Sequence, residues 1–255
     1  GQATGKPICE LMGGRHGDSF KLYRAITMAS AEEMAANVGE YRRQGYTKFQ
    51  LKVGGDPLED IERIKAVRAI LADDEILVAD ANTGWRVDAA ARVVKGVRDV
   101  DVYIEQPCQS YEHSLTIRRR TDLPFILDEN IDSLPMLMRA HQDGAMDSIN
   151  LKISKFGGLT KARVARDVCV TLGIPMNIED TWGSDFITAA IAHLSHSTPE
   201  EYRFAATDFN AYVDIKTGSG LSDKQSGTAR APETPGLGIT PDFGVLGEPE
   251  FEVKA

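Results

Sequence analysis

Residues 47–55, TKFQLKVGG, form a short apolar run that ends on Lys52 and is followed by two glycines. Residues 147–158, DSINLKISKFGG, repeat this arrangement around Lys152. In both stretches apolar and polar side chains alternate, which is typical of a strand with two different faces. A glycine pair directly after a strand favours a tight turn. We therefore predict two strands that end alike, each carrying a lysine near its end.

Three further apolar runs between these lysines end on a carboxylate. ILVAD ends on Asp80, VYIE on Glu105 and FILD on Asp128, and the three acids are separated by 25 and 23 residues, roughly one strand and one helix each. Each acid taken alone could be a helix cap or a solvated loop residue. Three in succession at the same point of consecutive units favour a shared site of hard oxygen ligands, which suits Mg²⁺. A lysine on either side suits removal of a proton next to a carboxylate.

The whole chain alternates short strand-like runs with helical ones. A helix is predicted from Ser30 to Gln44, where Ser30 and Glu33 form a capping box. Alternating strands and helices indicate a parallel sheet, and eight strands close most easily into a barrel. The predicted fold class is therefore α/β, a TIM-like (β/α)7β barrel. The predicted strands are 21–27, 47–53, 75–80, 101–105, 124–128, 147–154, 174–179 and 202–207.

Strand alternation predicts the direction of the site side chains. If Phe49 and Leu51 face the helices, Gln50 and Lys52 face the barrel interior, and the same alternation turns Lys152 inward. The three carboxylates can point inward by the same parity. All five side chains then meet at the C-terminal mouth, where barrel enzymes carry out their chemistry. The alternative is that the lysines are surface residues or phosphate contacts.

Composition restricts the class of protein. The chain has 255 residues, is 42% hydrophobic and carries a net charge of −9 without a basic block, so a nucleic-acid partner is not expected. No apolar run approaches the ~18 residues of a membrane helix and no signal peptide is visible, so no membrane partner is expected. Cys9, Cys108 and Cys169 share no metal-ligand spacing and are interpreted as reduced thiols. We expect a cytoplasmic homo-oligomer that acts on a small molecule.

Five motifs in order, K-V-G-G, D-A-N, I-E-Q-P, L-D-E and N-L-K-I-S-K-F-G-G-L-T, resemble the barrel of the enolase superfamily, muconate lactonizing enzyme subgroup. The resemblance covers about residues 1 to 207. It implies Mg²⁺ held by Asp80, Glu105 and Asp128. It also implies that Lys52 and Lys152 act as bases on opposite faces of an amino-acid-type carboxylate substrate. In such sites a lysine or histidine base removes the proton and Mg²⁺ stabilises the resulting enediolate.

One position departs from this subgroup, which usually has Lys-x-Lys on the second strand. Gln50 occupies the first lysine position, so a positive charge that helps lower the pKa of Lys52 is missing. Gln50 and Asn82 are candidate substrate contacts. Glu129 is a candidate supporting residue if the backbone turns after Asp128, and Lys155 is expected to be a supporting or surface residue.

The segment N-I-E-D-T-W-G-S-D contains the clue to the substrate. Trp182 beside Glu179 and Asp180 would receive a cationic nitrogen by cation–π contact and charge pairing, although Trp182 could instead be an ordinary rim aromatic. This segment resembles the branch acting on proline derivatives, including cis-3-hydroxyproline dehydratases and hydroxyproline betaine 2-epimerases. We predict dehydration with 2-epimerisation ahead of betaine epimerisation, and dipeptide epimerisation third. A Schiff-base aldolase and a non-catalytic metal-binding barrel are the alternatives of other classes.

The resemblance also suggests a domain organisation. Members of this family carry an N-terminal α+β capping domain that has no counterpart in this chain, and the sequence lacks an initiator methionine. We therefore expect a C-terminal part of a longer protein. Residues 1–20 would connect to the capping domain, 21–210 would form the barrel, and 211–255 would be an irregular segment returning to the cap. Residues 219–235 are rich in Gly, Ser and Pro and are predicted to form a loop.

Overall fold

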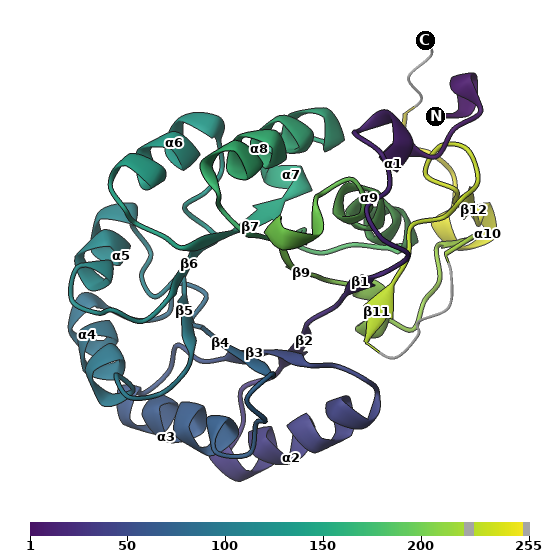
Figure 1. Cartoon of the computed structure of the whole chain (residues 1–255). Helices are drawn as coiled ribbons and strands as arrows, with labels where there is room; N and C mark the ends of the chain where they lie inside the picture. Colours follow the sequence, from purple (N-terminus) through teal and green to yellow (C-terminus); the bar gives the residue numbers. More distant parts are fainter. Residues whose placement is uncertain (222–226, 252–255) are drawn as a thin grey trace.

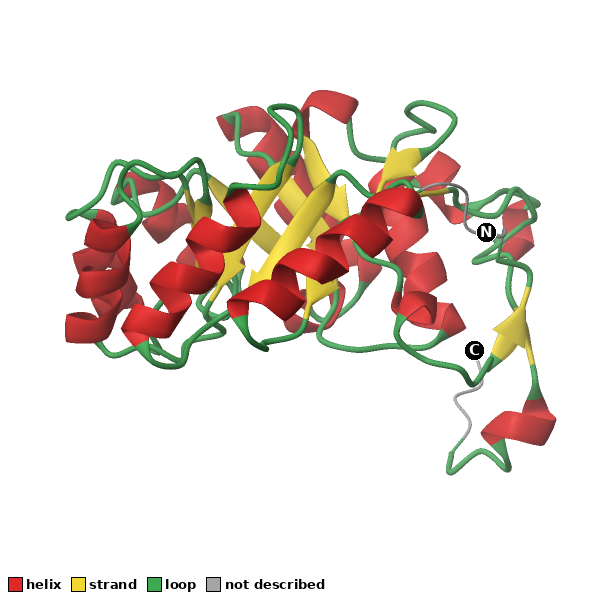
Figure 2. Ribbon diagram, turned by 90° about the horizontal axis from the view of Figure 1, so that it is seen from below, coloured by secondary structure: helices red, strands yellow, loops and turns green. Residues whose placement is uncertain are grey.

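The computed structural model describes residues 1–221 and 227–251. Within them lies a parallel sheet of eight strands in the order of the sequence, curled into a ring with helices outside it (Figure 1). Seen from the side, the helices cover the outer face of the strands (Figure 2). The predicted (β/α)7β barrel is confirmed. The strands are β2 (Arg24–Ile26), β3 (Lys48–Lys52), β4 (Ile76–Asp80), β5 (Tyr103–Glu105), β6 (Phe125–Leu127), β7 (Ser148–Lys152), β8 (Met176–Glu179) and β9 (Arg203–Ala206).

Each of the first seven strands is followed by a helix. The capping box predicted at Ser30 begins α2, and Asp56 caps α3 through the backbone amides of Leu58 and Glu59. The short helix α7 precedes α8 in the sixth connection. The helices around the barrel are α2 (Ala31–Arg43), α3 (Pro57–Arg68), α4 (Val87–Gly96), α5 (Tyr111–Arg118), α6 (Leu134–Gln142), α7 (Ile153–Phe156), α8 (Leu159–Leu172) and α9 (Asp185–His196).

The ring closes where the first and last strands meet. Leu22 forms a parallel bridge with Ala206, and the backbone N–H of Tyr23 donates to the Ala206 carbonyl over 3.0 Å. The predicted strand 21–27 is therefore divided. Phe20 and Lys21 pair as β1 with a C-terminal strand, and the chain crosses to the barrel at Leu22 before β2 begins.

The core lies between the sheet and the helices. Phe49 and Leu51 on β3, and Ile149 and Leu151 on β7, are fully buried on the outer face of the sheet. Each large apolar side chain that is buried contributes about 1.5–3 kcal/mol to the free energy of folding, so this layer is the main source of stability. On these two strands, alternation then leaves polar residues such as Gln50 and Asn150 on the inner face, as the sequence pattern predicts.

The two ends of the described chain pack together beside α9 (Figure 1). Pro7 bridges Gly236, and β1 (Phe20–Lys21) pairs antiparallel with β11 (Thr228–Ala229). The loop predicted for 219–235 contains β11 and part of β10, and its residues 222–226 lie outside the described residues. The expected connection of residues 1–20 and 211–255 to a capping domain stays a prediction. The remaining elements are η1 (Gln2–Thr4), α1 (Ile8–Leu11), η2 (Glu200–Tyr202), η3 (Phe209–Ala211), β10 (Gly218–Ser219), β12 (Thr240–Pro241) and α10 (Phe243–Leu246).

Two predictions about composition can be compared with the fold. All three cysteines lie within the described residues and are buried free thiols. No helix in residues 1–221 or 227–251 is long and apolar enough to cross a bilayer. The predicted homo-oligomer and cellular location stay predictions.

Candidate active site

A cavity of about 330 Å³ opens at the C-terminal ends of the strands. Its wall contains both predicted lysines, and two of the three predicted carboxylates, Asp80 and Asp128, line it directly. The other predicted contacts on its wall are Gln50, Asn82, Glu179, Asp180 and Trp182. Residues separated by more than a hundred positions therefore share one space, as the parity of the strands predicts.

Lys52 and Asp80 form one side of the mouth. They are paired in register on β3 and β4, and the Lys52 Nζ lies 2.5 Å from Asp80 Oδ2. The Lys52 side chain is 32% exposed, whereas that of Asp80 is 1% exposed. The ammonium group thus reaches the cavity while its carboxylate partner stays beneath it.

Lys152 lies on the other side and contacts two carboxylates. Its Nζ is 2.7 Å from Asp128 Oδ2 and 3.3 Å from Glu179 Oε1. Asp128 also accepts from Lys155, 3.0 Å away at Oδ1, and the same ammonium group donates to the Asp128 carbonyl over 2.9 Å. Lys155 is thus a supporting residue of this side and not a surface residue. The Lys152 side chain is 12% exposed, which makes this side the drier of the two.

Glu105 lies between the two sides and is held by amides. Gln50 Nε2 is 3.1 Å from both carboxylate oxygens, and Asn150 Nδ2 is 2.6 Å from Oε1. Burial and repulsion from Asp80, Asp128 and Glu179 raise the pKa of Glu105 well above its ordinary value. Gln50 therefore binds this carboxyl group without neutralising it.

The donor set fits a divalent cation in charge but not yet in geometry. Carboxylates outnumber ammonium groups around the mouth. The carboxylates are Asp80, Glu105, Asp128, Glu129, Glu179 and Asp180, and the ammonium groups are Lys52, Lys152 and Lys155. A bound Mg²⁺ would relieve this excess. Among the residues described, no three His, Cys, Asp or Glu side chains are grouped closely enough to hold an ion as they stand. In this structure Asp80 is paired with Lys52, and Asp128 with Lys152 and Lys155.

The same contacts control the protonation of the lysines. Burial lowers the pKa of Lys52, but the combined attraction of the carboxylates Asp80, Glu105 and Glu179 outweighs it and raises the pKa above its ordinary value. Burial also lowers the pKa of Lys152, and the combined attraction of Glu179, Asp128 and Glu129 raises it above its ordinary value. Both amines are therefore ammonium ions in this arrangement. A cation that withdraws the carboxylates would lower both pKa values, which agrees with the need for a neutral base.

Asn82 and Glu129 contact each other at the rim. The backbone turns directly after β6, so Glu129 points to the mouth, and Asn82 Nδ2 donates to Glu129 Oε1 over 3.3 Å. Asn82 and Thr83, in the loop after β4, adopt positive φ angles of 42° and 67°, which are uncommon for residues other than glycine. Burial and the neighbouring Asp128 raise the pKa of Glu129.

The segment after β8 has two different kinds of residue. The Asp180 carboxylate is occupied by hydrogen bonds within the protein, because it accepts from the Ser154 and Thr181 backbone amides and from the Ser154 hydroxyl. Trp182 is 61% exposed and packs against Phe209 with ring centroids 5.6 Å apart. Trp182 is therefore available to a ligand, whereas Asp180 positions the loop.

Glycine 54 of the K-V-G-G motif explains how the Lys52 side is built. Gly54 has a φ of +109°, and a Cβ there would lie 2.5 Å from the Ala81 carbonyl oxygen. The loops after β3 and β4 thus touch directly above Lys52 and Asp80. Buried Asp60 ties the same loops together, since it accepts from the Gly54 amide and from Trp85 Nε1.

Gln106 of the I-E-Q-P motif supports the Lys152 side. Its buried Oε1 accepts from the Asp128 amide over 2.9 Å and from the Asn130 amide over 3.3 Å. Its Nε2 donates to the Cys108 carbonyl over 3.0 Å. One side chain thereby joins the loops after β5 and β6 and fixes the backbone of Asp128.

Three contributors were missed by the sequence interpretation. Tyr23 Oη donates to Glu179 Oε2 over 2.6 Å, and Asn150 and Gln106 act as described. Gln106 belongs to the I-E-Q-P motif, and a polar residue directly after a buried strand is a signal that could have indicated its role. No sequence signal indicates the role of Tyr23, because its position depends on the closure of the barrel.

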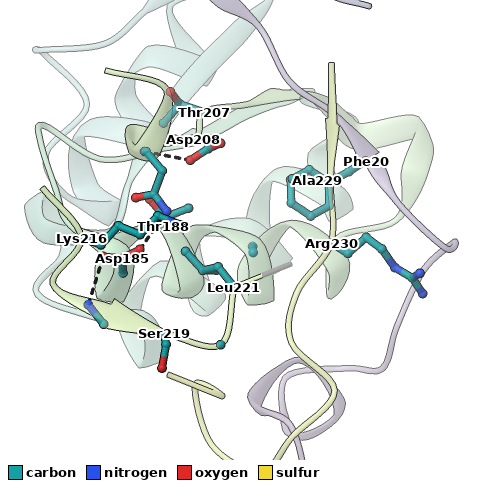
Figure 3. A pocket seen from close by; sticks show the side chains of 14 residues that line it. Phe20, Asp185, Thr188, Thr207, Asp208, Lys216, Ser219, Leu221, Ala229 and Arg230 are labelled. Atoms are coloured by element: carbon teal, nitrogen blue, oxygen red, sulfur yellow. Dashed lines mark hydrogen bonds between the residues drawn. The ribbon is translucent and has the colours of Figure 1, made fainter. Parts of the chain in front are cut away.

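A second cavity, of about 400 Å³, lies between α9 and the C-terminal segment (Figure 3). Phe20 and Ala229 lie on one side of it, and Asp185 and Lys216 on the other. The Asp185 carboxylate accepts hydrogen bonds from the backbone amides of Thr217 and Gly218. None of the predicted site residues is among the described residues that line this cavity.

Comparison with known proteins identifies the class. Residues 33–245 match the family model described as enolase C-terminal domain-like. The chain belongs to this family, and with its barrel and its mouth of lysines and carboxylates it belongs to the enolase superfamily. Its relatives include a dehydratase, racemases and epimerases whose names give amino acids or their derivatives as substrates.

Particular relatives refine this class. The chain is 57% identical over 249 residues to a cis-3-hydroxy-L-proline dehydratase from Roseibium aggregatum, covering 98% of this chain and 68% of that enzyme. It is 28% identical to an L-Ala-D/L-Glu epimerase from Bacillus subtilis, covering 98% and 69%. A mandelate racemase/muconate lactonizing enzyme from Roseovarius nubinhibens ISM superposes with a TM-score of 0.93 at 43% identity, covering 98% of this chain and 70% of that one. A superfamily member from the same organism, solved complexed with magnesium, superposes with a TM-score of 0.93 at 34% identity, covering 98% and 68%.

Proposed function

We propose that this protein is a Mg²⁺-dependent cis-3-hydroxy-L-proline dehydratase with 2-epimerase activity. The observation that carries the proposal is the pair of lysines on β3 and β7 facing one cavity across three buried carboxylates. Identity of 57% to a dehydratase of that substrate supports the particular reaction.

The proposed chemistry starts at the Cα proton of the substrate. This proton is very weakly acidic, so a lysine removes it only if the resulting enediolate is stabilised. Mg²⁺ held by Asp80, Glu105 and Asp128 would supply that stabilisation by binding the substrate carboxylate. Lys52 and Lys152 are the two bases. Return of a proton from the opposite lysine gives the 2-epimer, whereas loss of the 3-hydroxyl gives the dehydrated product.

The secondary ammonium group of the substrate is assigned to the rim. Trp182 offers an exposed aromatic face beside the cavity, and Phe209 packs against that ring. A cation against an aromatic face gains about 0.5–1 kcal/mol at an exposed site. Gln50 and Asn82 face the same space and complete the proposed substrate contacts.

The second candidate is 4-hydroxyproline betaine 2-epimerase. It is favoured by the same Trp182 face, because a quaternary ammonium group cannot donate hydrogen bonds and depends on cation–π contact. It would use both lysines but would need no leaving group. Dipeptide epimerisation is the third, supported by the relative from Bacillus subtilis.

The test is proton NMR in D₂O with Mg²⁺ and candidate prolines. We expect cis-3-hydroxy-L-proline to lose water and L-proline to gain deuterium at Cα. EDTA should stop both reactions and added Mg²⁺ should restore them. An intact Cα proton in every proline, betaine and dipeptide tested contradicts the proposed chemistry. Trapping of a carbonyl substrate by borohydride would instead indicate the aldolase class.

A further inference from the structure

Dehydration needs something that epimerisation does not. Epimerisation moves one proton between two bases, whereas loss of a hydroxyl group requires a proton on the departing oxygen, because hydroxide is a poor leaving group. Lys52 and Lys152 meet the first requirement, and when Lys52 is the base the ammonium group of Lys152 is the donor to Cα. Dehydration needs a proton at the 3-hydroxyl instead, either from Lys152 itself or from an acid beside it.

Glu179 has the position of such an acid. It ends β8, is 3% exposed and lines the cavity beside Lys152. Three groups hold its carboxyl group: Tyr23 Oη at 2.6 Å, Asn177 Nδ2 at 3.2 Å and Lys152 Nζ at 3.3 Å. By contrast, Asp180 next to it is committed to the loop. Burial raises the pKa of Glu179 to about 7, so a protonated fraction exists near neutral pH.

Tyr23 positions this carboxyl group. Its backbone is anchored at the closure of the barrel by the bond to Ala206, and its hydroxyl reaches Glu179 from the position directly before β2. Burial and the adjacent Glu179 raise the pKa of Tyr23 well above its ordinary value, so the phenol keeps its proton. Tyr23 is thus a fixed donor that orients one carboxyl oxygen and leaves the other toward Lys152.

We propose that Glu179, oriented by Tyr23, protonates the departing 3-hydroxyl group of the substrate. This rests on the proposed function and replaces the nitrogen-binding role that the sequence suggested for Glu179. In cis-3-hydroxy-L-proline the hydroxyl and carboxylate share one face of the ring, so the Cα hydrogen lies on the other face. With the hydroxyl on the Glu179 and Lys152 side, Lys52 is the base for the L isomer.

The step is balanced as follows. The Cα–H bond breaks and its proton goes to Lys52 Nζ. The C3–O bond breaks with its electron pair on oxygen, which takes the Glu179 proton and departs as water. The electron pair from Cα forms the C2–C3 double bond. Lys52 returns its proton to solvent and Glu179 takes one back, so the net change is the loss of one water molecule.

The decisive variant is Glu179→Gln, which keeps the shape but carries no acidic proton. We expect the dehydration rate to fall by about 100-fold or more, while deuterium exchange at Cα of L-proline stays within a few-fold of wild type. Elimination of chloride from cis-3-chloro-L-proline should also stay within a few-fold, because chloride leaves without a proton. Glu201→Gln, an exposed acid at the opposite end of the barrel, is the matched control and should change neither rate.

A second variant tests the positioning residue. Tyr23→Phe removes a donor that lowers the pKa of Glu179, so the pH range over which dehydration is active should extend upward. The other charges facing Glu179 are Lys152, Asp128 and Lys52, and this variant leaves all three in place. Its kcat for dehydration should fall with little change in KM.

The outcomes separate the two proposals. If Glu179→Gln slows dehydration, exchange and chloride elimination alike, Glu179 is only a structural or binding residue and the inference is wrong. If Glu179→Gln dehydrates at the wild-type rate, the acid is another group. If the wild-type enzyme exchanges no Cα proton, the proposed function itself fails, and the assignment of Glu179 fails with it.

Discussion

The two sides of the barrel mouth hold their lysines differently. Lys52 has one carboxylate partner and a side chain that is 32% exposed, whereas Lys152 has two partners and is 12% exposed. The Lys152 side also contains Lys155 on Asp128 and Tyr23 on Glu179. The Lys52 side depends on the close approach of two loops at Gly54 instead. One side is arranged for access and the other for a dense network of charges, although both lysines occupy equivalent strand ends.

Replacing either lysine should have the largest effect on activity. The two variants test whether the lysines act on opposite faces of the substrate. Lys52→Ala and Lys152→Ala should each reduce epimerisation of proline by at least about 1,000-fold, because each base supplies one half of the reaction. Deuterium exchange should distinguish them: Lys152→Ala should still exchange the L isomer and Lys52→Ala the D isomer. NMR of both isomers in D₂O measures this. Full epimerisation by either variant, or equal exchange of one isomer by both, contradicts the assignment.

Neutralising the acid beneath each lysine should give the next largest effect. Asp128→Asn and Asp80→Asn should each weaken Mg²⁺ binding by at least about tenfold, since each removes an anionic ligand from a hard cation. Asp128 is the stronger test, because two ammonium groups would then face the ion beside a neutral amide. Calorimetry with Mg²⁺ gives the affinity. Asp132→Asn, an exposed acid near α6, serves as the control, and an unchanged affinity in Asp128→Asn would remove Asp128 from the metal site.

The dense side should also depend on Gln106 for stability. Gln106→Ala leaves the backbone amides of Asp128, which is buried, and of Asn130 without their acceptor, so the free energy of unfolding should fall by about 3 kcal/mol. Urea unfolding monitored by circular dichroism measures the change. Gln109→Ala, an exposed glutamine in the same loop, should lower it by less than about 0.5 kcal/mol. Equal losses in the two variants would mean that the bonds of Gln106 add little.

The rim should show the smallest effect. Trp182→Leu should raise the KM for a proline substrate about fivefold, equivalent to about 1 kcal/mol of cation–π contact, with kcat nearly unchanged. Trp182→Phe keeps a weaker aromatic face and should raise KM by less. Steady-state kinetics with cis-3-hydroxy-L-proline distinguish the two. An equal KM in Trp182→Leu and wild type would mean that the ring nitrogen binds elsewhere.

Much of the fold could be predicted because local pattern and global architecture agree. Alternation in TKFQLKV buries Phe49 and Leu51 and turns Lys52 inward, and the structure keeps that parity. The prediction was wrong at residues 21–27, where one apolar run became two elements. Pairing of Phe20 with Ala229, far along the chain, decided that division, and local sequence contains no record of it.

The sequence could predict which candidate residues lie at the common mouth, but not which of them contact one another. Apolar runs ending on Lys52, Asp80, Glu105, Asp128 and Lys152 were sufficient to predict a common mouth, because parallel strands bring their C-terminal ends to one edge. Which lysine meets which carboxylate depends on side-chain reach across the ring. The contact of Lys152 with both Asp128 and Glu179 therefore appears only in three dimensions.

The sequence by itself determined the barrel, its parity and the residues at its mouth, since hydrophobic period and strand spacing act over a few residues. Only the tertiary structure decided the difference between the two sides. Tyr23 reaches Glu179 because the ring closes at Ala206, and Gln106 fixes Asp128 because two loops meet. Those contacts join residues 156 and 22 positions apart. Packing of the whole barrel sets such distances, and with them the charge and protonation of each group.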